Sequence, residues 1–223
     1  MKNLKALTFD YYGTIGDKRA LTGLIEEHHP GQGVALTKHW FATCQRYCFQ
    51  NGMMERYTPW DELTRSALQF ASADLGLTLD PRLAEKLIKA DATLPVSEDA
   101  PAALDRLAAR FRLYVLSMGS AWMIESSQKN AGIAKYFTGI ITTQQSAIYK
   151  PRKEAYALAS KHTGLSFDEI GFISGNSFDV IGSKNAGLFT AWVRRYDQPL
   201  DPLGLTPDLI VTDLSELADK LGA

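Results

Sequence analysis

One aspartate follows the first apolar run of the chain. Asp10 ends the run in LTFDYYGTIGD, and Gly13 and Thr14 stand directly behind it. A carboxylate in such a place can act as a nucleophile, and a nearby hydroxyl can donate a hydrogen bond to it. A single aspartate after a strand is more often a helix cap, so Asp10 alone does not identify a site.

Similar polar groups follow three later apolar runs. They are Ser117 in LSMGS, where Met118 follows it, Lys150 in AIYKP, and Ser174, Asn176 and Asp179 in SGNSFD. In an open parallel sheet, ligands bind beyond the carboxyl ends of the strands. We therefore expect two carboxylates, an ammonium group, several hydroxyls and a carboxamide at one edge of a sheet, an arrangement that isolated caps and solvated loops do not explain.

The elements that position these groups alternate between strands and helices. The predicted strands are Leu4–Phe9, Leu113–Ser117, Gly139–Thr142, Ile170–Ser174, Thr190–Val193 and Leu209–Val211. Helices are predicted from Ser120 to Ala131, Lys153 to Thr163 and Ser177 to Ala186, and SFDE at Ser166–Glu169 has the pattern of a capping box. This alternation predicts an α/β fold with a doubly wound, Rossmann-like parallel sheet covered on both faces.

Residues 16–98 interrupt that alternation. Helices are predicted from about Val34 to Gln50, from Thr58 to near Gly76 with Pro59 in the first turn, and from Asp80-Pro81 onward. We therefore expect an α/β core domain at residues 1–15 and 99–223. An all-helical cap at residues 16–98 would cover the carboxyl end of the first strand.

Composition narrows the class of protein. The 223 residues are 45% apolar and carry a net charge of −1, with no basic stripe of the kind that binds nucleic acid. No apolar run is long enough to cross a bilayer, and MKNLKALTFD enters a strand pattern at once, so neither a membrane span nor a signal peptide is expected. Cys44 and Cys48 are one helical turn apart and are expected to be reduced core residues of a cytoplasmic protein.

The four motifs together resemble the haloacid dehalogenase superfamily. FDYYGT, LSMGS, YKP and SGNSFD occur in that order, with a helical insert after the first, and the resemblance is closest to the L-2-haloacid dehalogenases. It implies a hydrolase whose aspartate forms an ester intermediate and which uses no cofactor. It also implies a small halogenated carboxylate as substrate, a D-2-hydroxy acid as product, and a possible homodimer.

The resemblance assigns a role to each motif residue. Asp10 is expected to be the nucleophile, held ionised by Lys150, since a nearby cation favours the charged form of a carboxylate. Asp179 is expected to lie near Lys150 and to orient the hydrolytic water. Thr14, Ser117, Ser174 and Asn176 are expected to hold the carboxylate, the substrate or that water.

Tyr12 separates this sequence from the phosphatases of the superfamily. Those enzymes have a second aspartate at this position as a general acid, and a further acid in the fourth motif that helps to hold magnesium. Here the positions read Tyr12 and Ser174-Gly175-Asn176, which leaves few anionic ligands for a hard cation, so no metal site is expected. A halide needs no proton in order to leave, so this loss fits carbon–halogen displacement.

The lid departs from the resembling enzymes. Trp40 and Tyr47 match the spacing of their lid, and the arginine that receives the halide there then falls on Asn51. Arg46 could substitute only in a different lid register, and Met118 replaces a usual asparagine. Tyr12, Phe70 and Phe178 are expected to line an apolar substrate pocket with Met118.

Three classes of function remain open at this stage. The first is a metal-independent dehalogenase of short L-2-haloacids. The second is a phosphatase or other hydrolase of a small metabolite, and the third is a non-catalytic or regulatory relative whose dehalogenase activity is weak or lost. The complete set of motif residues speaks against the third class, and metal dependence separates the first two.

Overall fold

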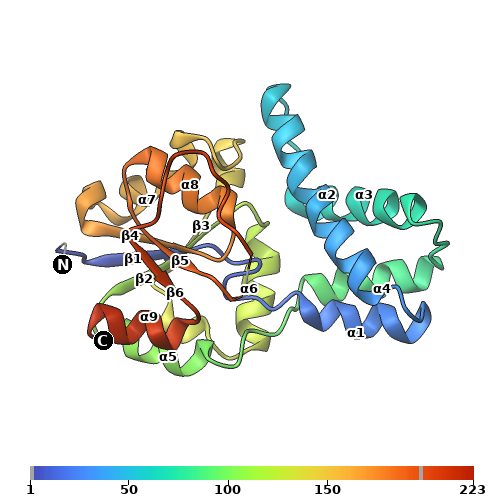
Figure 1. Cartoon of the computed structure of the whole chain (residues 1–223), viewed down its shortest axis with the longest axis horizontal. Helices are drawn as coiled ribbons and strands as arrows, with labels where there is room; N and C mark the ends of the chain where they lie inside the picture. Colours follow the sequence, from blue (N-terminus) through green and yellow to red (C-terminus); the bar gives the residue numbers. More distant parts are fainter. Residues whose placement is uncertain (1–2, 196–197) are drawn as a thin grey trace.

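A parallel sheet forms the middle layer of one part of the structure, and a part made of helices alone stands beside it (Figure 1). The computed structural model describes residues 3–195 and 198–223. Within them the strands are β1 (Ala6–Phe9), β2 (Arg112–Ser117), β3 (Gly139–Thr142), β4 (Ile170–Ser174), β5 (Phe189–Val193) and β6 (Leu209–Val211). Their order across the sheet is β3-β2-β1-β4-β5-β6, and every neighbouring pair is parallel. The predicted α/β fold class is confirmed, and β1, which carries Asp10 behind it, lies near the middle of the sheet.

Helices cover both faces of this sheet. They are α5 (Ala100–Ala108), α6 (Ala121–Asn130), α7 (Lys153–Thr163), α8 (Ser177–Ala186) and α9 (Leu214–Leu221), with short 3-10 turns at Ala134–Tyr136, Thr143–Ser146 and Phe167–Glu169. Figure 1 shows α7 and α8 on one side and α5 and α9 on the other. Successive strand residues face opposite sides, so Leu7 and Phe9 join one apolar cluster while Ala6 joins the other.

Two local predictions about helix starts have different outcomes. The capping box at Ser166 and Glu169 is present, although it starts a 3-10 turn. Ser120 precedes α6 as expected, but its hydroxyl does not cap the helix. It donates instead to Asp61 Oδ1 in the inserted segment at 2.6 Å, because the cap places that carboxylate beside it.

The inserted segment is helical and stands beside the sheet (Figure 1). Its helices are α1 (Arg19–His28), α2 (Gly33–Met53), α3 (Trp60–Asp74) and α4 (Pro81–Asp91). The sequence pattern did not predict α1. The second helix continues past Asn51, where we expected its end, and α3 starts after Pro59. Asp80 caps α4 by accepting a hydrogen bond from the Arg82 amide.

The chain enters and leaves this segment at one place. Gly16 forms a bridge with Val96, the Asp17 amide donates to Pro95 O at 2.8 Å, and the Ser97 amide donates to Ile15 O at 3.1 Å. The chain therefore passes into and out of the inserted segment side by side. This arrangement suits a boundary between an α/β core at residues 1–15 and 99–223 and a cap at residues 16–98. That division stays a prediction.

The structure also bears on the two cysteines and on the expected lack of a membrane span. Cys44 and Cys48 are buried on α2 and neither forms a disulfide. In the part of the chain that the structure describes, no helix combines the length and apolar character needed to span a bilayer.

Candidate active site

Asp10 lies at the carboxyl edge of the sheet and is almost fully buried. Its Oδ1 accepts a hydrogen bond from Lys150 Nζ at 3.1 Å. Its Oδ2 accepts one from the Thr14 hydroxyl at 3.2 Å and one from Asn176 Nδ2 at 2.8 Å. The two carboxylate oxygens are therefore unequal, since one faces a single cation and the other two neutral donors.

Lys150 bridges two carboxylates in the interior. Its ammonium lies 3.1 Å from Asp10 Oδ1 and 2.9 Å from Asp179 Oδ2, and its side chain is fully buried. Burial alone would lower the pKa of Lys150, but the two neighbouring carboxylates outweigh it and raise the pKa above its ordinary value. Lys150 thus stays protonated beside Asp10.

Asp179 is held by three donors. Its Oδ2 accepts from Lys150 and from Ser174 Oγ at 3.2 Å, and its Oδ1 accepts from the Tyr156 hydroxyl at 2.6 Å. Burial raises the pKa of Asp179 to about 6, against the opposing effect of Lys150. A carboxylate with that pKa can accept a proton near neutral pH.

Two tight turns bring these groups together. The Gly175 amide donates to Thr14 Oγ1 at 2.8 Å, which ties the turn after β4 to the turn after β1. A Cβ at Gly175 would lie 2.3 Å from Gly13 O, so a larger residue would push the turns apart. Gly13 has a φ of +83°, which glycine adopts without strain. The glycines thus set the separation of Asp10 from Asn176.

A cavity of about 210 Å³ opens above Asp10. Core residues Asp10, Tyr12, Ser117, Met118, Gly119, Asn176 and Phe178 line it together with Lys18, Phe41, Ala42, Gln45 and Trp60 from the inserted segment. This volume is below the about 300–1,000 Å³ of drug-sized ligand sites, so it suits a small molecule. The Tyr12 and Trp60 rings stack at a centroid distance of 5.2 Å and form an apolar wall.

The structure brings together most of the residues that the sequence singled out, but not Asn51 and Phe70. Asn51 Nδ2 donates to Thr58 Oγ1 at 3.3 Å and does not line the cavity. Asn51 is six positions after Gln45 on α2, which at about 100° per residue is about 120° short of two full turns. The Asn51 side chain therefore points away from the side of α2 that faces the cavity. The register that we expected for the lid therefore does not place position 51 at the substrate.

Phe70 and Arg46 belong to a cluster outside the cavity. Phe70 is exposed, its ring lies 6.2 Å from that of Tyr47, and the Arg46 guanidinium lies 4.8 Å from the Phe70 centroid. Trp40 is fully buried, and its Nε1 donates to Thr64 O at 2.8 Å. Neither Arg46 nor Phe70 contributes to the cavity wall, because α2 and α3 pack these side chains on their outer surface.

Sequence reasoning missed several residues of the site. Tyr156 is on α7, whose pattern indicated only a helix that packs on the sheet, so nothing in it marked the hydroxyl. Lys18 stands between β1 and α1 in a stretch without regular periodicity. Nothing in the sequence pattern distinguished Phe41 and Trp60 from other aromatic residues, and the rotation of their helices brings them to the cavity.

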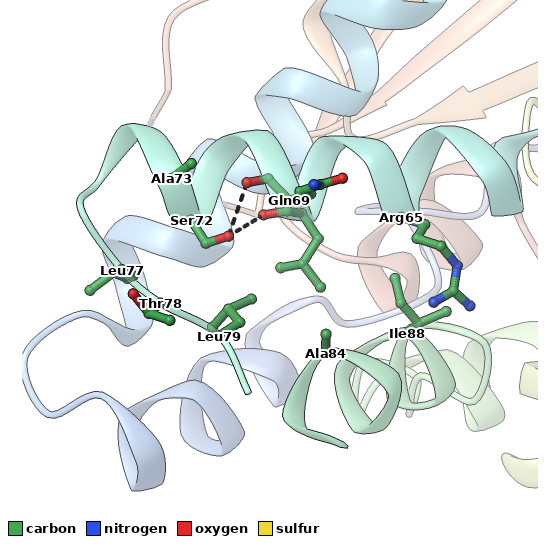
Figure 2. Close-up of a pocket in the computed structure, with 10 residues that line it drawn as sticks. Arg65, Gln69, Ser72, Ala73, Leu77, Thr78, Leu79, Ala84 and Ile88 are labelled. Atoms are coloured by element: carbon green, nitrogen blue, oxygen red, sulfur yellow. Dashed lines mark hydrogen bonds between the residues drawn. The ribbon is translucent and has the colours of Figure 1, made fainter. Parts of the chain in front are cut away.

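Two other places in the described residues were candidates for a site, a metal-binding cluster and a second pocket. Within residues 3–195 and 198–223, no group of three or more His, Cys, Asp or Glu side chains could hold a metal ion. Figure 2 shows a separate pocket of about 380 Å³ between α3 and α4, where the Ser72 hydroxyl donates to Leu68 O and Gln69 O. Its charged lining residue, Arg65, pairs with Glu85, so this pocket offers no reactive group.

Comparisons with known proteins agree with this geometry. The family model for haloacid dehalogenase-like hydrolase matches residues 4–187. An (S)-2-haloacid dehalogenase from Pseudomonas putida is 32% identical over 222 residues, 99% of this chain and 98% of that protein. The structure of L-2-haloacid dehalogenase from Xanthobacter autotrophicus has a TM-score of 0.90 and 29% identity, with 99% of both chains covered. A structure of the same enzyme with chloropropionic acid covalently bound also has a TM-score of 0.90, at 28% identity and the same coverage.

Proposed function

The chain belongs to the haloacid dehalogenase-like hydrolases, and we propose that it hydrolyses short L-2-haloacids to D-2-hydroxy acids through an ester on Asp10. The observation that carries this proposal is the environment of Asp10. Its carboxylate faces a small cavity with apolar walls, and it is bound from behind by Lys150, Thr14 and Asn176. The covalently bound chloropropionic acid in the Xanthobacter relative supports an ester route.

The first step is displacement at carbon. Asp10 Oδ1 has a single donor and is the freer nucleophile, so it attacks C2 from the side opposite the halogen. The new carbon–oxygen bond forms as the carbon–halogen bond breaks, and the halide leaves with the electron pair. Ser117 lines the cavity and can donate its hydroxyl proton to the substrate carboxylate, while its oxygen accepts the Gly119 amide at 3.1 Å.

The second step is hydrolysis of the ester. Water adds to the carbonyl carbon of Asp10, and Asp179 accepts one of its protons. The negative charge then develops on Oδ2, where Thr14 and Asn176 already donate. Such preorganised donors stabilise a tetrahedral intermediate. The acyl–oxygen bond breaks, the alkoxide takes the second proton of the water, and Asp179 releases its proton to solvent.

The donor set argues for a mechanism without metal. Asp179 has hydrogen bonds from Lys150, Ser174 and Tyr156, so a divalent cation would have to displace one of them. Tyr12, whose side chain is buried against Trp60, cannot act as the general acid that an alkoxide leaving group of a phosphate ester needs. Both features support halide as the leaving group.

The test is a pair of substrate panels with and without EDTA. Purified enzyme should release halide from 2-chloropropionate and 2-bromopropionate at the same rate in both conditions. Phosphate release from a panel of small phosphate esters should stay at background. Phosphatase activity that EDTA abolishes, without halide release, would replace this proposal with the small-metabolite phosphatase.

A further inference from the structure

Lys18 is a cation in the catalytic cavity that the reaction described above does not use. It stands between β1 and α1, and its half-buried side chain lines the cavity together with Asp10, Met118 and Trp60. Its ammonium lies 4.1 Å from the centroid of the Phe41 ring and 6.0 Å from that of Tyr12. A Cβ built on Gly13 would lie 3.7 Å from it, which places the ammonium above the first catalytic turn.

The ammonium of Lys18 forms no ion pair with a carboxylate in the part of the chain that the structure describes. Among the described residues, no carboxylate lies within 4.0 Å of Lys18 Nζ, and no hydrogen bond of its side chain is found. Burial lowers the pKa of Lys18, although Asp10 and Asp91 act against this effect. A desolvated cation that only aromatic rings contact is incompletely satisfied, so an anion that entered the cavity would find a ready partner.

Lys18 is also the only positively charged residue among the described residues that line this cavity. Lys150 is already shared between two carboxylates on the opposite side of Asp10. Asn51 and Arg46, the donors considered for the leaving group, point elsewhere. The cap side of the cavity otherwise offers Phe41, Ala42, Gln45 and Trp60, none of which is charged.

The geometry of displacement selects this side for the halide. A nucleophile that attacks from behind expels its leaving group in the opposite direction, so the halide moves away from Asp10 toward the cap. We propose that Lys18 receives the departing halide in this protein, an inference that rests on the proposed dehalogenation. The positive charge for this step then comes from the segment that enters the cap, and not from a cap helix.

The surroundings of Lys18 also give the halide a way out. A second pocket of about 780 Å³ is lined by Lys18 and Phe41 together with Arg19, Thr22, Gly23, Val34, Thr37, Lys38 and Gln198. Lys18 and Phe41 therefore separate the catalytic cavity from this outer pocket. A halide bound to the ammonium would therefore lie next to the outer pocket, which Arg19 and Lys38 also line.

The decisive experiment compares Lys18→Met with Lys18→Arg. Methionine keeps the apolar stem over Phe41 and removes the charge. For Lys18→Met we expect kcat for halide release to fall roughly 100-fold, as when a donor to a developing anion is removed. KM should change much less, since this charge forms only in the transition state. Lys18→Arg should recover much of the loss. Lys38→Met is the matched control, because it removes a charge from the outer pocket alone.

Chloride binding gives a second measurement. It should be lost with the charge of Lys18, whereas a Lys18 with only a structural role would not affect it. Line broadening of the ³⁵Cl resonance should reveal chloride bound to the wild type and to Lys38→Met, and should be lost with Lys18→Met. Lys18→Gln replaces Lys18→Met if the latter does not fold. A folded, uncharged variant with wild-type kcat and chloride broadening would overturn this inference alone. A wild type that releases no halide from any haloacid would overturn the proposed function, and this inference with it.

Discussion

The hydroxyl of Tyr156 donates to Asp179 Oδ1 at 2.6 Å, so a residue of α7 supports a carboxylate that follows β4. A hydrogen bond to the ionised form of a carboxylate lowers its pKa. This bond therefore opposes the burial that raises the pKa of Asp179 to about 6. Tyr156 acts on the reaction through Asp179, as a positioning residue.

Tyr156→Phe should raise the pKa of Asp179 further. Because hydrolysis of the ester needs ionised Asp179, activity falls as pH decreases through this pKa, and the variant should lose activity at a higher pH than the wild type. On the alkaline plateau the two enzymes should differ by only a few-fold. The measurement is kcat from pH 4.5 to 8.5. Tyr114→Phe, another buried tyrosine on the same face of the sheet, should leave the profile unchanged. Identical acid limbs for Tyr156→Phe and wild type would refute this role.

Asp10→Asn should abolish turnover, because an amide is a far weaker nucleophile than a carboxylate. The variant should fold normally, since the three side chains that donate to Asp10 are each held by a second hydrogen bond. Thr14 accepts from the Gly175 amide, Lys150 donates to Asp179, and Asn176 donates to Tyr12 O. Multiple turnovers of the wild type in ¹⁸O-water should place label in the peptide that contains Asp10. A single turnover that labels the product, and leaves this peptide unlabelled, would exclude the ester.

The stereochemistry of the product tests the direction of attack. Displacement from behind inverts C2, and hydrolysis at the carbonyl carbon of Asp10 leaves C2 untouched. L-2-chloropropionate should therefore give D-lactate, as measured by chiral chromatography. A product with retained configuration, or a racemic product from one enantiomer, would contradict this mechanism.

The catalytic edge could be predicted from the sequence because the strands determine it. Asp10 directly follows β1, Ser117 and Ser174 end β2 and β4, and the topology alone brings the ends of parallel strands together. Lys150 follows the 3-10 turn Thr143–Ser146 that comes after β3, and Asp179 lies in the first turn of α8, directly after the turn that ends β4. The positions of these five residues follow from the strands they come after, and the sequence pattern predicts those strands.

The cap side of the site could not be predicted in the same way. Which residues of a helix face the cavity depends on its rotation and axial position. The expected register of α2 placed Asn51 at the cavity, where the structure has Gln45. Lys18 lies outside any regular element, and its place above Gly13 depends on how the chain crosses into the cap. Tertiary packing decides both, and the pattern of a single sequence contains no signal for it.

Asn51→Ala and Phe70→Ala should change kcat and KM by less than about twofold, since neither side chain lines the cavity. Trp60→Ala provides the contrast, because it removes the ring stacked on Tyr12 and opens one wall of the cavity. Its KM for 2-chloropropionate should rise. Steady-state kinetics of the three variants check this expectation, and a large loss for Asn51→Ala alone would restore the expected lid register.

Asp91 predicts a pH dependence of stability. It is fully buried at the end of α4, its Oδ2 accepts from Thr64 Oγ1 at 3.1 Å, and its Oδ1 has no partner among the described residues. Burial raises the pKa of Asp91 from 3.8 to about 7, against the opposing effects of the Thr64 hydrogen bond and of Lys18. The folded protein therefore holds a proton between these two pH values that the unfolded chain has released.

The free energy of unfolding should consequently fall as pH rises from about 4 to above 7, because the folded state then binds more protons than the unfolded state. A shift of roughly three pKa units corresponds to about 4 kcal/mol. Asp91→Asn does not titrate, so its unfolding free energy relative to wild type should increase by that order across this range, whatever its absolute stability. Urea denaturation from pH 4.5 to 8.5 measures the difference. Asp105→Asn, at an exposed position on α5, should give a constant offset. Parallel curves for Asp91→Asn and wild type would show that Asp91 is ionised in the folded protein throughout.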